Sequence, residues 1–354
     1  MTRILMKGAE AVGEAAIKAG CRHFFGYPIT PQNEIPEYMS RRLPQVGGTY
    51  VQGESEVASI NMLFGCAGAG VRVMTSSSSP GISLMQEGIS YIAGAELPVV
   101  IINMVRGGPG LGGIQPAQSD YFQATRGGGH GDYFTMVLAP ATVQEAVELV
   151  MDAFDLADKY RNPVLVLGDG IIGQMMEPVE FPEKEPARFE KPWATTGCKG
   201  REPNIVKSLL LDPYALEEHN RKLQQKYERM KREDVRVETV DLEGAEVVLC
   251  AYGTTSRVCR TAMERLKEKG VRVGLIRPIT LFPFPEKTVQ ALDPKKVKFI
   301  LTVEMSLGQM VQDVKLFTEG RIPVHFFGRT GGVVPTPQEV VHEVLKHLGK
   351  EVEK

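Results

Sequence analysis

Two carboxylates, Glu54 and Glu56, stand where a short β-prone segment gives way to a helix. The segment Tyr50 to Gln52 precedes them, and apolar residues then recur at steps of three and four residues over 57–70, which predicts a helix. An acidic group at a helix start can simply offset the exposed N–H groups of the first turn. It can also exchange protons with a ligand, because open α/β sheets bind ligands where a strand ends and a helix begins. The spacing leaves both interpretations open.

A stiff loop presents the next candidate, Thr30. The loop follows a strand predicted at 23–25 and reads Gly26-Tyr27-Pro28-Ile29-Thr30-Pro31. Its two prolines fix their own φ angles and keep the residues before them out of the helical region. Such a loop would hold the Thr30 hydroxyl still for a ligand. Thr30 can also act as the cap, with Pro31 as the first residue, of a helix predicted over 32–42, and the two roles are compatible.

A serine-rich turn follows another predicted strand. Four serines at 76–79 stand between a strand predicted at 71–75 and a helix predicted at 82–93, and the turn continues as Ser79-Pro80-Gly81. Hydroxyls at the carboxyl end of a strand can donate hydrogen bonds to an anion or to a ring nitrogen. They can equally be capping groups alone.

Arg106 follows a strand predicted at 98–104, whose Val and Ile residues are typical of a central parallel strand. Its fork of donors suits bidentate contact with a carboxylate, although an arginine after a strand is often a surface ion-pair partner. Nine glycines between Gly107 and Gly131 let backbone approach a ligand or a neighbouring subunit closely. A loop of this length favours a functional role. His130, in the same loop, has no second histidine or obvious base partner and is interpreted as structural.

A glycine-rich motif later in the chain matches a dinucleotide-binding loop in sequence but lacks the elements that should follow it. Gly168-Asp169-Gly170-Ile171-Ile172-Gly173 follows a predicted strand and matches the spelling of a dinucleotide-binding loop. A Rossmann unit needs a full helix and another strand next, yet this chain continues into a proline-rich stretch. We therefore reject the NAD interpretation and expect a simple turn at a strand end.

Composition and charge narrow the class of protein. The chain has 354 residues, a length typical of two domains, with 43% hydrophobic and 24% charged residues as in ordinary globular proteins. A net charge of −2 gives no overall basic field for nucleic acid or an anionic membrane. Five dispersed cysteines without a C-x-x-C pair predict neither a disulfide framework nor a metal cage. With no signal peptide or membrane span recognisable in the sequence, we expect a cytoplasmic protein.

The order of the predicted elements indicates an α/β fold with two doubly wound, mostly parallel sheets. Strands and helices alternate through a first domain, residues 1–176. A proline-rich linker with a charged helix follows at 177–240, and a second α/β domain fills 241–354. One side of the charged helix is expected to pack against the rest of the protein, and it carries Leu216, Leu223, Tyr227 and Met230.

Five motifs taken together resemble the alpha chain of the 2-oxoacid:ferredoxin oxidoreductases over essentially the whole chain. They are Gly26 to Pro31, Glu54-Ser55-Glu56, Ser79-Pro80-Gly81, Arg106-Gly107-Gly108-Pro109 and Val303-Glu304-Met305-Ser306-Leu307-Gly308-Gln309. The resemblance is greatest to the branched-chain, 2-oxoisovalerate type, which has a short alpha chain. The segment after the arginine, Gly110 to Pro116, is part of that resemblance.

The resemblance implies a thiamine diphosphate enzyme that cleaves a 2-oxoacid, with coenzyme A taking the acyl group and ferredoxin the electrons. The first domain would bind the pyrimidine half of the cofactor, and the second would resemble the transketolase C-terminal domain. Glu56 matches the carboxylate that hydrogen-bonds the aminopyrimidine and promotes its imino form. Thr30 and Arg106 match the pair that holds the substrate's carboxylate. The remaining cofactor-binding residues implied by the motifs are Tyr27, Pro28 and Ser79.

The resemblance also implies partner chains, because this sequence has neither a diphosphate-and-metal motif nor a cysteine set for a cluster. A beta subunit would hold the diphosphate and Mg²⁺, a ferredoxin-like delta subunit would carry [4Fe-4S] clusters, and a gamma subunit would complete the complex. Two copies of the alpha–beta unit are expected. The glycine-rich loop and the charged helix are candidate contact surfaces.

Two questions stay open at this point. The preferred substrate can be 2-oxoisovalerate, 2-oxoglutarate or pyruvate, because a pocket's preference for side-chain shape is spread over several residues. The chain can also be a noncatalytic scaffold that kept the fold and lost the site, and the presence of Thr30, Glu56 and Arg106 argues against that hypothesis.

Overall fold

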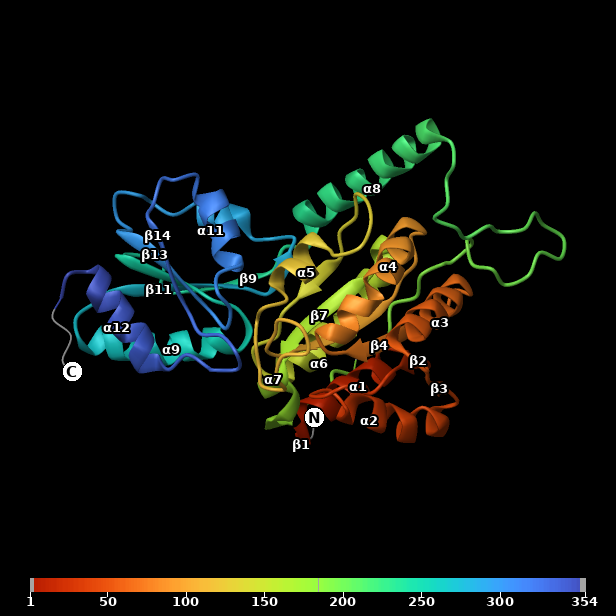
Figure 1. Cartoon of the computed structure of the whole chain (residues 1–354), viewed down its shortest axis with the longest axis horizontal. Coiled ribbons are helices and arrows are strands. Elements are labelled where there is room, and N and C mark those ends of the chain that lie inside the picture. Colours follow the sequence, from red (N-terminus) through yellow and green to blue (C-terminus); the bar gives the residue numbers. More distant parts are fainter. Residues whose placement is uncertain (1–2, 184, 351–354) are drawn as a thin grey trace.

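The computed structural model describes residues 3–183 and 185–350, which form two main sheets (Figure 1). The larger sheet has the strand order β12-β6-β7-β5-β4-β2-β3, and the smaller has the order β14-β13-β10-β11-β9. β12 is antiparallel to β6, and β9 is antiparallel to β11. The other neighbours in both sheets run parallel. The predicted α/β fold with two mostly parallel sheets is confirmed.

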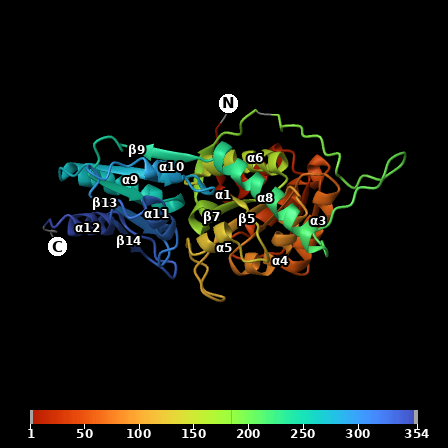
Figure 2. The same ribbon diagram turned by 90° about the horizontal axis from the view of Figure 1, so that it is seen from above.

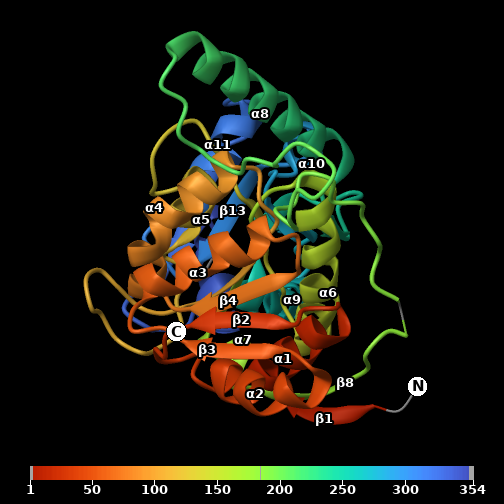
Figure 3. The same ribbon diagram turned by 90° about the vertical axis from the view of Figure 1, so that its right-hand side faces the viewer.

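The first domain is built on the larger sheet. Its strands are β2 (His23–Gly26), β3 (Thr49–Gln52), β4 (Val73–Ser77), β5 (Val100–Val105), β6 (Met136–Leu138), β7 (Val164–Asp169) and β12 (Thr280–Phe282). Its helices are α1 (Gly8–Lys18), α2 (Glu34–Arg42), α3 (Glu56–Gly68), α4 (Pro80–Gly94), α5 (Tyr121–Arg126), α6 (Val143–Tyr160) and α7 (Gly170–Gln174), with a short 3₁₀ turn at Pro44–Val46. α3 and α4 lie on one side of the sheet and α6 on the other (Figure 3). β4, β5 and β7 are therefore buried along their whole lengths.

The second domain is built on the smaller sheet. Its strands are β9 (Val237–Val240), β10 (Val247–Cys250), β11 (Val273–Pro278), β13 (Phe299–Glu304) and β14 (Val324–Gly328). Its helices are α9 (Gly253–Glu268), α10 (Glu286–Gln290), α11 (Met310–Thr318) and α12 (Pro337–His347). α9 and α12 cover one face, and α11 covers the other (Figure 1). Within the described residues, no helix is both long and apolar enough to cross a bilayer.

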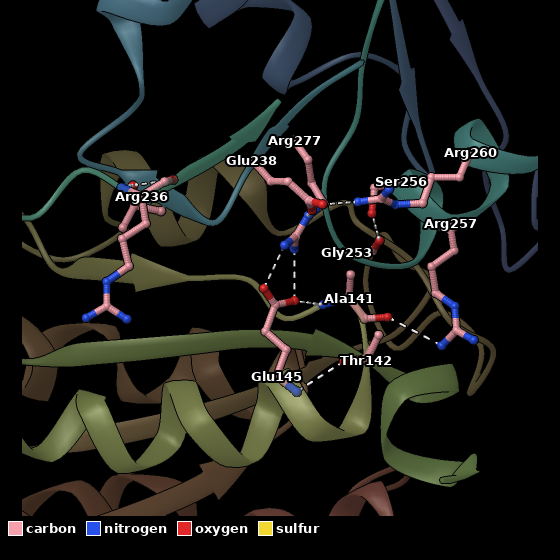
Figure 4. Close-up of polar contacts among 11 residues, drawn as sticks. Ala141, Thr142, Glu145, Arg236, Glu238, Gly253, Ser256, Arg257, Arg260 and Arg277 are labelled. Atoms are coloured by element: carbon pink, nitrogen blue, oxygen red, sulfur yellow. Dashed lines mark hydrogen bonds and ion pairs between the residues drawn. The ribbon is translucent and has the colours of Figure 1, made fainter. Parts of the chain in front are cut away.

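Arg277, on β11, joins the two domains through a buried ion pair (Figure 4). Its Nη1 and Nη2 donate to the Glu145 carboxylate on α6 at 2.8 and 2.7 Å, and its Nε donates to Glu238 on β9 at 2.5 Å. The Arg277 side chain is 7% exposed and that of Glu145 is 18% exposed, so solvent screens this pair little, whereas Glu238 is 36% exposed. Removing one partner of such a buried pair typically costs about 3–5 kcal/mol. Arg277 is therefore one of the contacts that hold the two domains together.

Three aromatic rings from distant parts of the chain pack together beside β6. Phe134 and Phe282 stack with 4.4 Å between their centroids, and Tyr227 meets Phe134 edge-on at 5.4 Å. Tyr227 belongs to α8 (Pro213–Glu233), which lies across the first domain (Figure 2). The predicted packing face of this helix is confirmed for Leu223, Tyr227 and Met230, which are buried, whereas Leu216 is 38% exposed.

Several predictions about single elements were wrong. α2 begins at Glu34, and Asn33 stands at its N-cap position without a side-chain cap. Thr30 and Pro31 therefore do not start this helix. The glycine-rich loop is not structureless, because α5 lies within it. The prediction also missed β1 (Ile4–Lys7), β6, β8 (Met176–Val179), β9, β12, α10 and α11, all of them short elements.

The glycine spelling at 168–173 does not form a Rossmann unit. The helix that follows, α7, has five residues and is capped by the Asp169 side chain. The next strand, β8 (Met176–Val179), pairs with β1 (Ile4–Lys7) outside the main sheets. The predicted domain boundaries at 176 and 241 stay a prediction, since β8 and β9 both lie largely inside the predicted linker.

Candidate active site

The candidate residues of the first domain gather at one edge of the larger sheet. Thr30 follows β2, Glu56 follows β3, Ser79 follows β4 and Arg106 follows β5. These four strands run parallel as neighbours, so their carboxyl ends lie along the same edge. This is the edge at which open α/β sheets bind ligands.

Glu56 and Glu54 have different surroundings. Ser55 caps α3, because its Oγ accepts a hydrogen bond from the Ala58 N–H at 3.1 Å. Glu56, the first residue of the helix, is only 6% exposed, whereas Glu54 lies at the surface. A serine cap already satisfies an N–H group of the first turn, so the burial of Glu56 is not needed for capping.

The Glu56 carboxylate lies against Gly81 at the start of α4. A Cβ added to Gly81 would stand 2.7 Å from Glu56 Oε1 and 2.1 Å from Ser77 Oγ, so only glycine fits there. No donor among the described residues hydrogen-bonds the Glu56 carboxylate, and the buried Ser77 hydroxyl also has no partner among them. Buried polar groups are normally hydrogen-bonded. The arrangement therefore leaves a buried acid and a buried hydroxyl ready to bind a polar group.

Arg106 and Thr30 lie side by side. Arg106 Nη1 donates to the Thr30 carbonyl at 2.9 Å, and Nη2 donates to the Leu111 carbonyl at 2.9 Å. The Arg106 Nε is buried and has no partner in the described part of the chain. The Thr30 Oγ1 accepts from Asn33 Nδ2 at 3.4 Å, so its own proton remains available. The pair can therefore still donate to an anion.

Ser79 connects the turn after β4 to Arg106. The Ser79 Oγ accepts a hydrogen bond from the Arg106 N–H at 3.0 Å. Ser79 has a φ of +24°, a conformation that costs a non-glycine residue about 1–3 kcal/mol and persists only where its surroundings hold it. The Asn103 Oδ1 accepts from the Ser79 N–H at 3.1 Å, and Asn103 Nδ2 donates to Asp120 at 2.9 Å. Burial raises the pKa of the Asp120 carboxyl, and hydrogen bonds from Asn103 and Ser79 oppose that rise.

Other polar groups at this edge also lack partners. Ser76 Oγ donates to Gln32 Oε1 at 2.5 Å, but the buried Gln32 Nε2 has no acceptor among the described residues. Tyr27 and Pro28 are exposed in the loop after β2, and no hydrogen bond within the described chain joins them to Glu56 or Arg106. His130 is exposed. A groove of about 600 Å³ opens beside Thr30, and its wall includes Asn33, Ile114, Gln115, Pro116 and Gln174.

The fifth motif lies in the second domain, at the end of β13. Glu304 is buried at the end of β13, and its carboxylate accepts four hydrogen bonds of 2.8–3.1 Å from Ser306 Oγ and from the N–H groups of Gln309, Met310 and Val311. Burial raises the pKa of the Glu304 carboxyl, and these hydrogen bonds oppose the rise. Glu304 therefore stabilises a turn within its own domain.

Sequence reasoning missed the polar residues behind the site, Asn103, Asp120 and Gln118. Asn103 did leave a signal, because it is the one polar residue in the otherwise apolar strand β5. Asp120 and Gln118 left none, since both lie in an irregular segment and the partners of Gln118 are Tyr252, Thr255 and Met305.

Comparison with known proteins gives two matches to family descriptions. Residues 14–240 match the family described as pyruvate flavodoxin/ferredoxin oxidoreductase, thiamine diphosphate-binding. Residues 245–340 match the description pyruvate:ferredoxin oxidoreductase core domain II. The two matches follow each other in the chain as the first and second domains do.

Individual relatives match over nearly the whole chain. It is 50% identical to ketoisovalerate oxidoreductase subunit VorB of Methanothermobacter thermautotrophicus, over 99% of both chains. It is 38% identical to 2-oxoglutarate synthase subunit KorA of Methanocaldococcus jannaschii, over 96% of this chain and 98% of that one.

A solved structure has the same fold. It is the 2-oxoglutarate:ferredoxin oxidoreductase of Magnetococcus marinus with 2-oxoglutarate, coenzyme A and succinyl-CoA bound, with a TM-score of 0.85 at 30% identity. The match covers 98% of this chain and 65% of that one, so this chain spans somewhat less than two thirds of the solved chain.

Proposed function

Since this chain belongs to the thiamine diphosphate-binding family of pyruvate flavodoxin/ferredoxin oxidoreductases, we propose that it is the alpha subunit of a 2-oxoacid:ferredoxin oxidoreductase. The reaction would be the oxidative decarboxylation of a 2-oxoacid with coenzyme A to acyl-CoA and CO₂, with the electrons passing to ferredoxin. The observation that carries the proposal is the buried Glu56 carboxylate, which lies against Gly81 without a protein donor at the edge that also holds Thr30 and Arg106.

The substrate we propose is 2-oxoisovalerate. The chain is 50% identical to a subunit named for ketoisovalerate and 38% identical to one named for 2-oxoglutarate. A preference for one small side chain over another is worth only about 1–3 kcal/mol per methylene, so 2-oxoglutarate and pyruvate are the alternatives to test. A noncatalytic scaffold is the other alternative, and the intact arrangement of Thr30, Glu56 and Arg106 argues against it.

The residues around Glu56 suit the pyrimidine half of thiamine diphosphate. Because Gly81 has no Cβ, the Glu56 carboxylate and the Ser77 hydroxyl can lie close to the start of α4, and both can hydrogen-bond a polar ring. Gln32 Nε2 and the Ser79 turn add further polar groups at the same edge. The bound cofactor supplies carbanion chemistry at its thiazolium ring. Glu56 would hold a proton at the aminopyrimidine and exchange it during activation.

Thr30 and Arg106 would orient the substrate. The Arg106 Nε and the Thr30 hydroxyl are the free donors of the pair, and a 2-oxoacid brings a carboxylate that accepts from both. A carboxylate held by charge-assisted hydrogen bonds keeps the neighbouring keto carbon in one place. Tyr27 and Pro28, exposed in the same loop, would complete the site together with a partner chain.

Partner subunits would supply the remaining chemistry. We propose a beta subunit for the diphosphate and Mg²⁺, a ferredoxin-like delta subunit for the [4Fe-4S] clusters, and a gamma subunit. The site edge carries exposed apolar side chains at Val57, Leu84, Leu111 and Ile114, which suits coverage by another chain. We also propose that the complex is cytoplasmic.

The test is to coexpress this chain with the subunits that copurify with it and to assay reduction of a viologen dye. We expect dye reduction that requires coenzyme A and is fastest with 2-oxoisovalerate among the three oxoacids. Faster turnover of 2-oxoglutarate or pyruvate would overturn the substrate, and a complex inactive with all three would overturn the enzymatic function.

A further inference from the structure

The segment after the glycine-rich part of the Arg106 loop is docked into the second domain. The Gln118 N–H donates to the Met305 carbonyl at 2.8 Å, and Gln118 Oε1 accepts from the Met305 N–H at 3.0 Å. Gln309 Nε2 donates to the Ser119 carbonyl at 2.7 Å, and Gln309 Oε1 accepts from the Phe122 N–H at 2.8 Å. Residues 118–122 are therefore held on both sides of Asp120 by the turn that Glu304 stabilises.

A second contact fixes the same segment from the helix side. The Tyr121 hydroxyl donates to Asp313 Oδ2 on α11 at 2.5 Å. Arg126, at the end of α5, forms an ion pair with the same carboxylate. Tyr121 is fully buried and Asp313 nearly so. The backbone at Asp120 is therefore fixed relative to the second domain.

Asp120 connects this segment to the first domain through Asn103. Its Oδ2 accepts from Asn103 Nδ2 at 2.9 Å, and Asn103 Oδ1 accepts from the Ser79 N–H at 3.1 Å. Asn103 is fully buried, and Asp120 is 9% exposed. The Asn103 NH₂ group therefore donates to Asp120, and its carbonyl oxygen accepts from the Ser79 N–H. The amide links the two residues in one orientation only.

Ser79 is the residue on which the candidate site depends. Its hydroxyl accepts from the Arg106 N–H, and two residues later Gly81 meets the Glu56 carboxylate. A residue at φ +24° keeps that conformation only while its hydrogen bonds hold it. A change at Asn103 should therefore reach both the arginine and the acid.

We propose that Asn103 and Asp120 are positioning residues, through which the second domain's 305–309 turn fixes the Ser79 turn and, with it, Arg106 and Glu56. They touch neither substrate nor cofactor in this role. The link itself stands on the structure, while its effect on substrate rests on the proposed function. The fifth motif, residues 303–309, then helps to position the candidate active site although it lies in the other domain.

The test exchanges the two side chains in the full-length chain with its partner subunits. Asn103→Asp places two carboxylates at hydrogen-bond distance, removes the donor and should release the turn. Adding Asp120→Asn to this variant returns an N–H donor opposite the new carboxylate, which keeps an oxygen free to accept from the Ser79 N–H. We expect N103D to raise the KM for the oxoacid about 2- to 30-fold, and the double variant to regain most of the wild-type value.

Hydrogen exchange measured by mass spectrometry tests the same link without any substrate. Peptides that cover residues 77–83 and 104–111 should exchange faster in N103D and regain protection in the double variant. The control is Asn162→Asp, which changes a buried asparagine that donates to the Phe134 and Pro163 carbonyls. N162D should leave exchange in these two segments and the KM unchanged.

A milder variant covers the case in which N103D does not fold. Gln309 is partly exposed, and Gln309→Ala removes its hydrogen bonds to residues 119 and 122. Hydrogen exchange in the same two segments should then rise, to a smaller extent than in N103D. Wild-type exchange in these segments for N103D, or for Q309A where N103D does not fold, would overturn the proposal, as would a double variant no better than N103D. If the wild-type complex has no activity with any oxoacid but hydrogen exchange in the two segments still changes in N103D, the link is upheld and the proposed function is rejected.

Discussion

Two buried glutamates, one in each domain, show how similar positions serve different purposes. Glu56 begins a helix directly after a parallel strand, whereas Glu304 ends a parallel strand and its carboxylate reaches the first N–H groups of the next helix, α11. Glu304 accepts four hydrogen bonds from its own turn, whereas no described donor reaches Glu56. Burial alone therefore does not identify a working carboxylate. A working carboxylate is identified by how few protein donors hydrogen-bond it. A fully hydrogen-bonded carboxylate stabilises the fold, whereas one without protein donors is available to a ligand.

The largest effect is expected at Glu56. Glu56→Gln keeps the shape of the side chain and removes its acid–base chemistry, so turnover should fall by about 100- to 10,000-fold. The thermal midpoint and subunit assembly should stay at wild-type values, because the carboxylate has no protein partner to lose. Glu54→Gln is the matched control, and steady-state assays should find it near wild type. Normal turnover in E56Q would remove the acid role.

Arg106 should show the next largest effect. Arg106→Ala removes charge-assisted donors from the oxoacid carboxylate, and the KM should rise about 10- to 100-fold. Arg106→Lys keeps the charge without the planar fork, so its KM should lie between the two. Initial rates over a range of oxoacid concentrations would measure both. An unchanged KM in R106A would take the arginine out of the substrate site.

Glu304 should behave in the opposite way to Glu56. Glu304→Gln turns an acceptor into a donor facing backbone N–H groups, which should lower the free energy of unfolding by about 1–3 kcal/mol. Turnover per folded complex should change far less than in E56Q. Urea denaturation and active-site titration would separate the two quantities. Loss of turnover at full stability would show that the comparison between the two glutamates is wrong.

The smallest effect concerns Asp120 and pH. Its pKa is raised by burial, so the folded chain binds this proton more tightly than the unfolded chain does. The associated stability is present below the ordinary value of 3.8 and is lost as pH rises through the higher folded pKa. Asp120→Asn should remove this part of the pH dependence. Free energies of unfolding for both proteins between pH 4 and 7 would reveal it, and parallel curves would contradict it.

Local sequence patterns predicted the parts of the fold whose residues interact with near neighbours. The helical period around Ile60 predicted α3, and the apolar run at 98–104 predicted β5. Thr30, Ser79 and Arg106 could be located because each follows a predictable strand. The polar link through Asn103 and Asp120 could not be predicted, because the residues on either side of Asp120 bond to a turn at 305–309 and the link has no periodicity. β12 was missed for the same reason, since three residues become a strand only by pairing with β6.

β12 has a consequence for the folding of the two domains. Thr280–Phe282 forms the outer strand of a sheet whose other members come from residues 23–169, and Phe282 fills the ring cluster beside it. A fragment ending at residue 240 would leave β6 bare, and a bare strand edge recruits other chains. Separating the two halves would thus expose an edge of the larger sheet, so we expect the halves to fold correctly only as one chain.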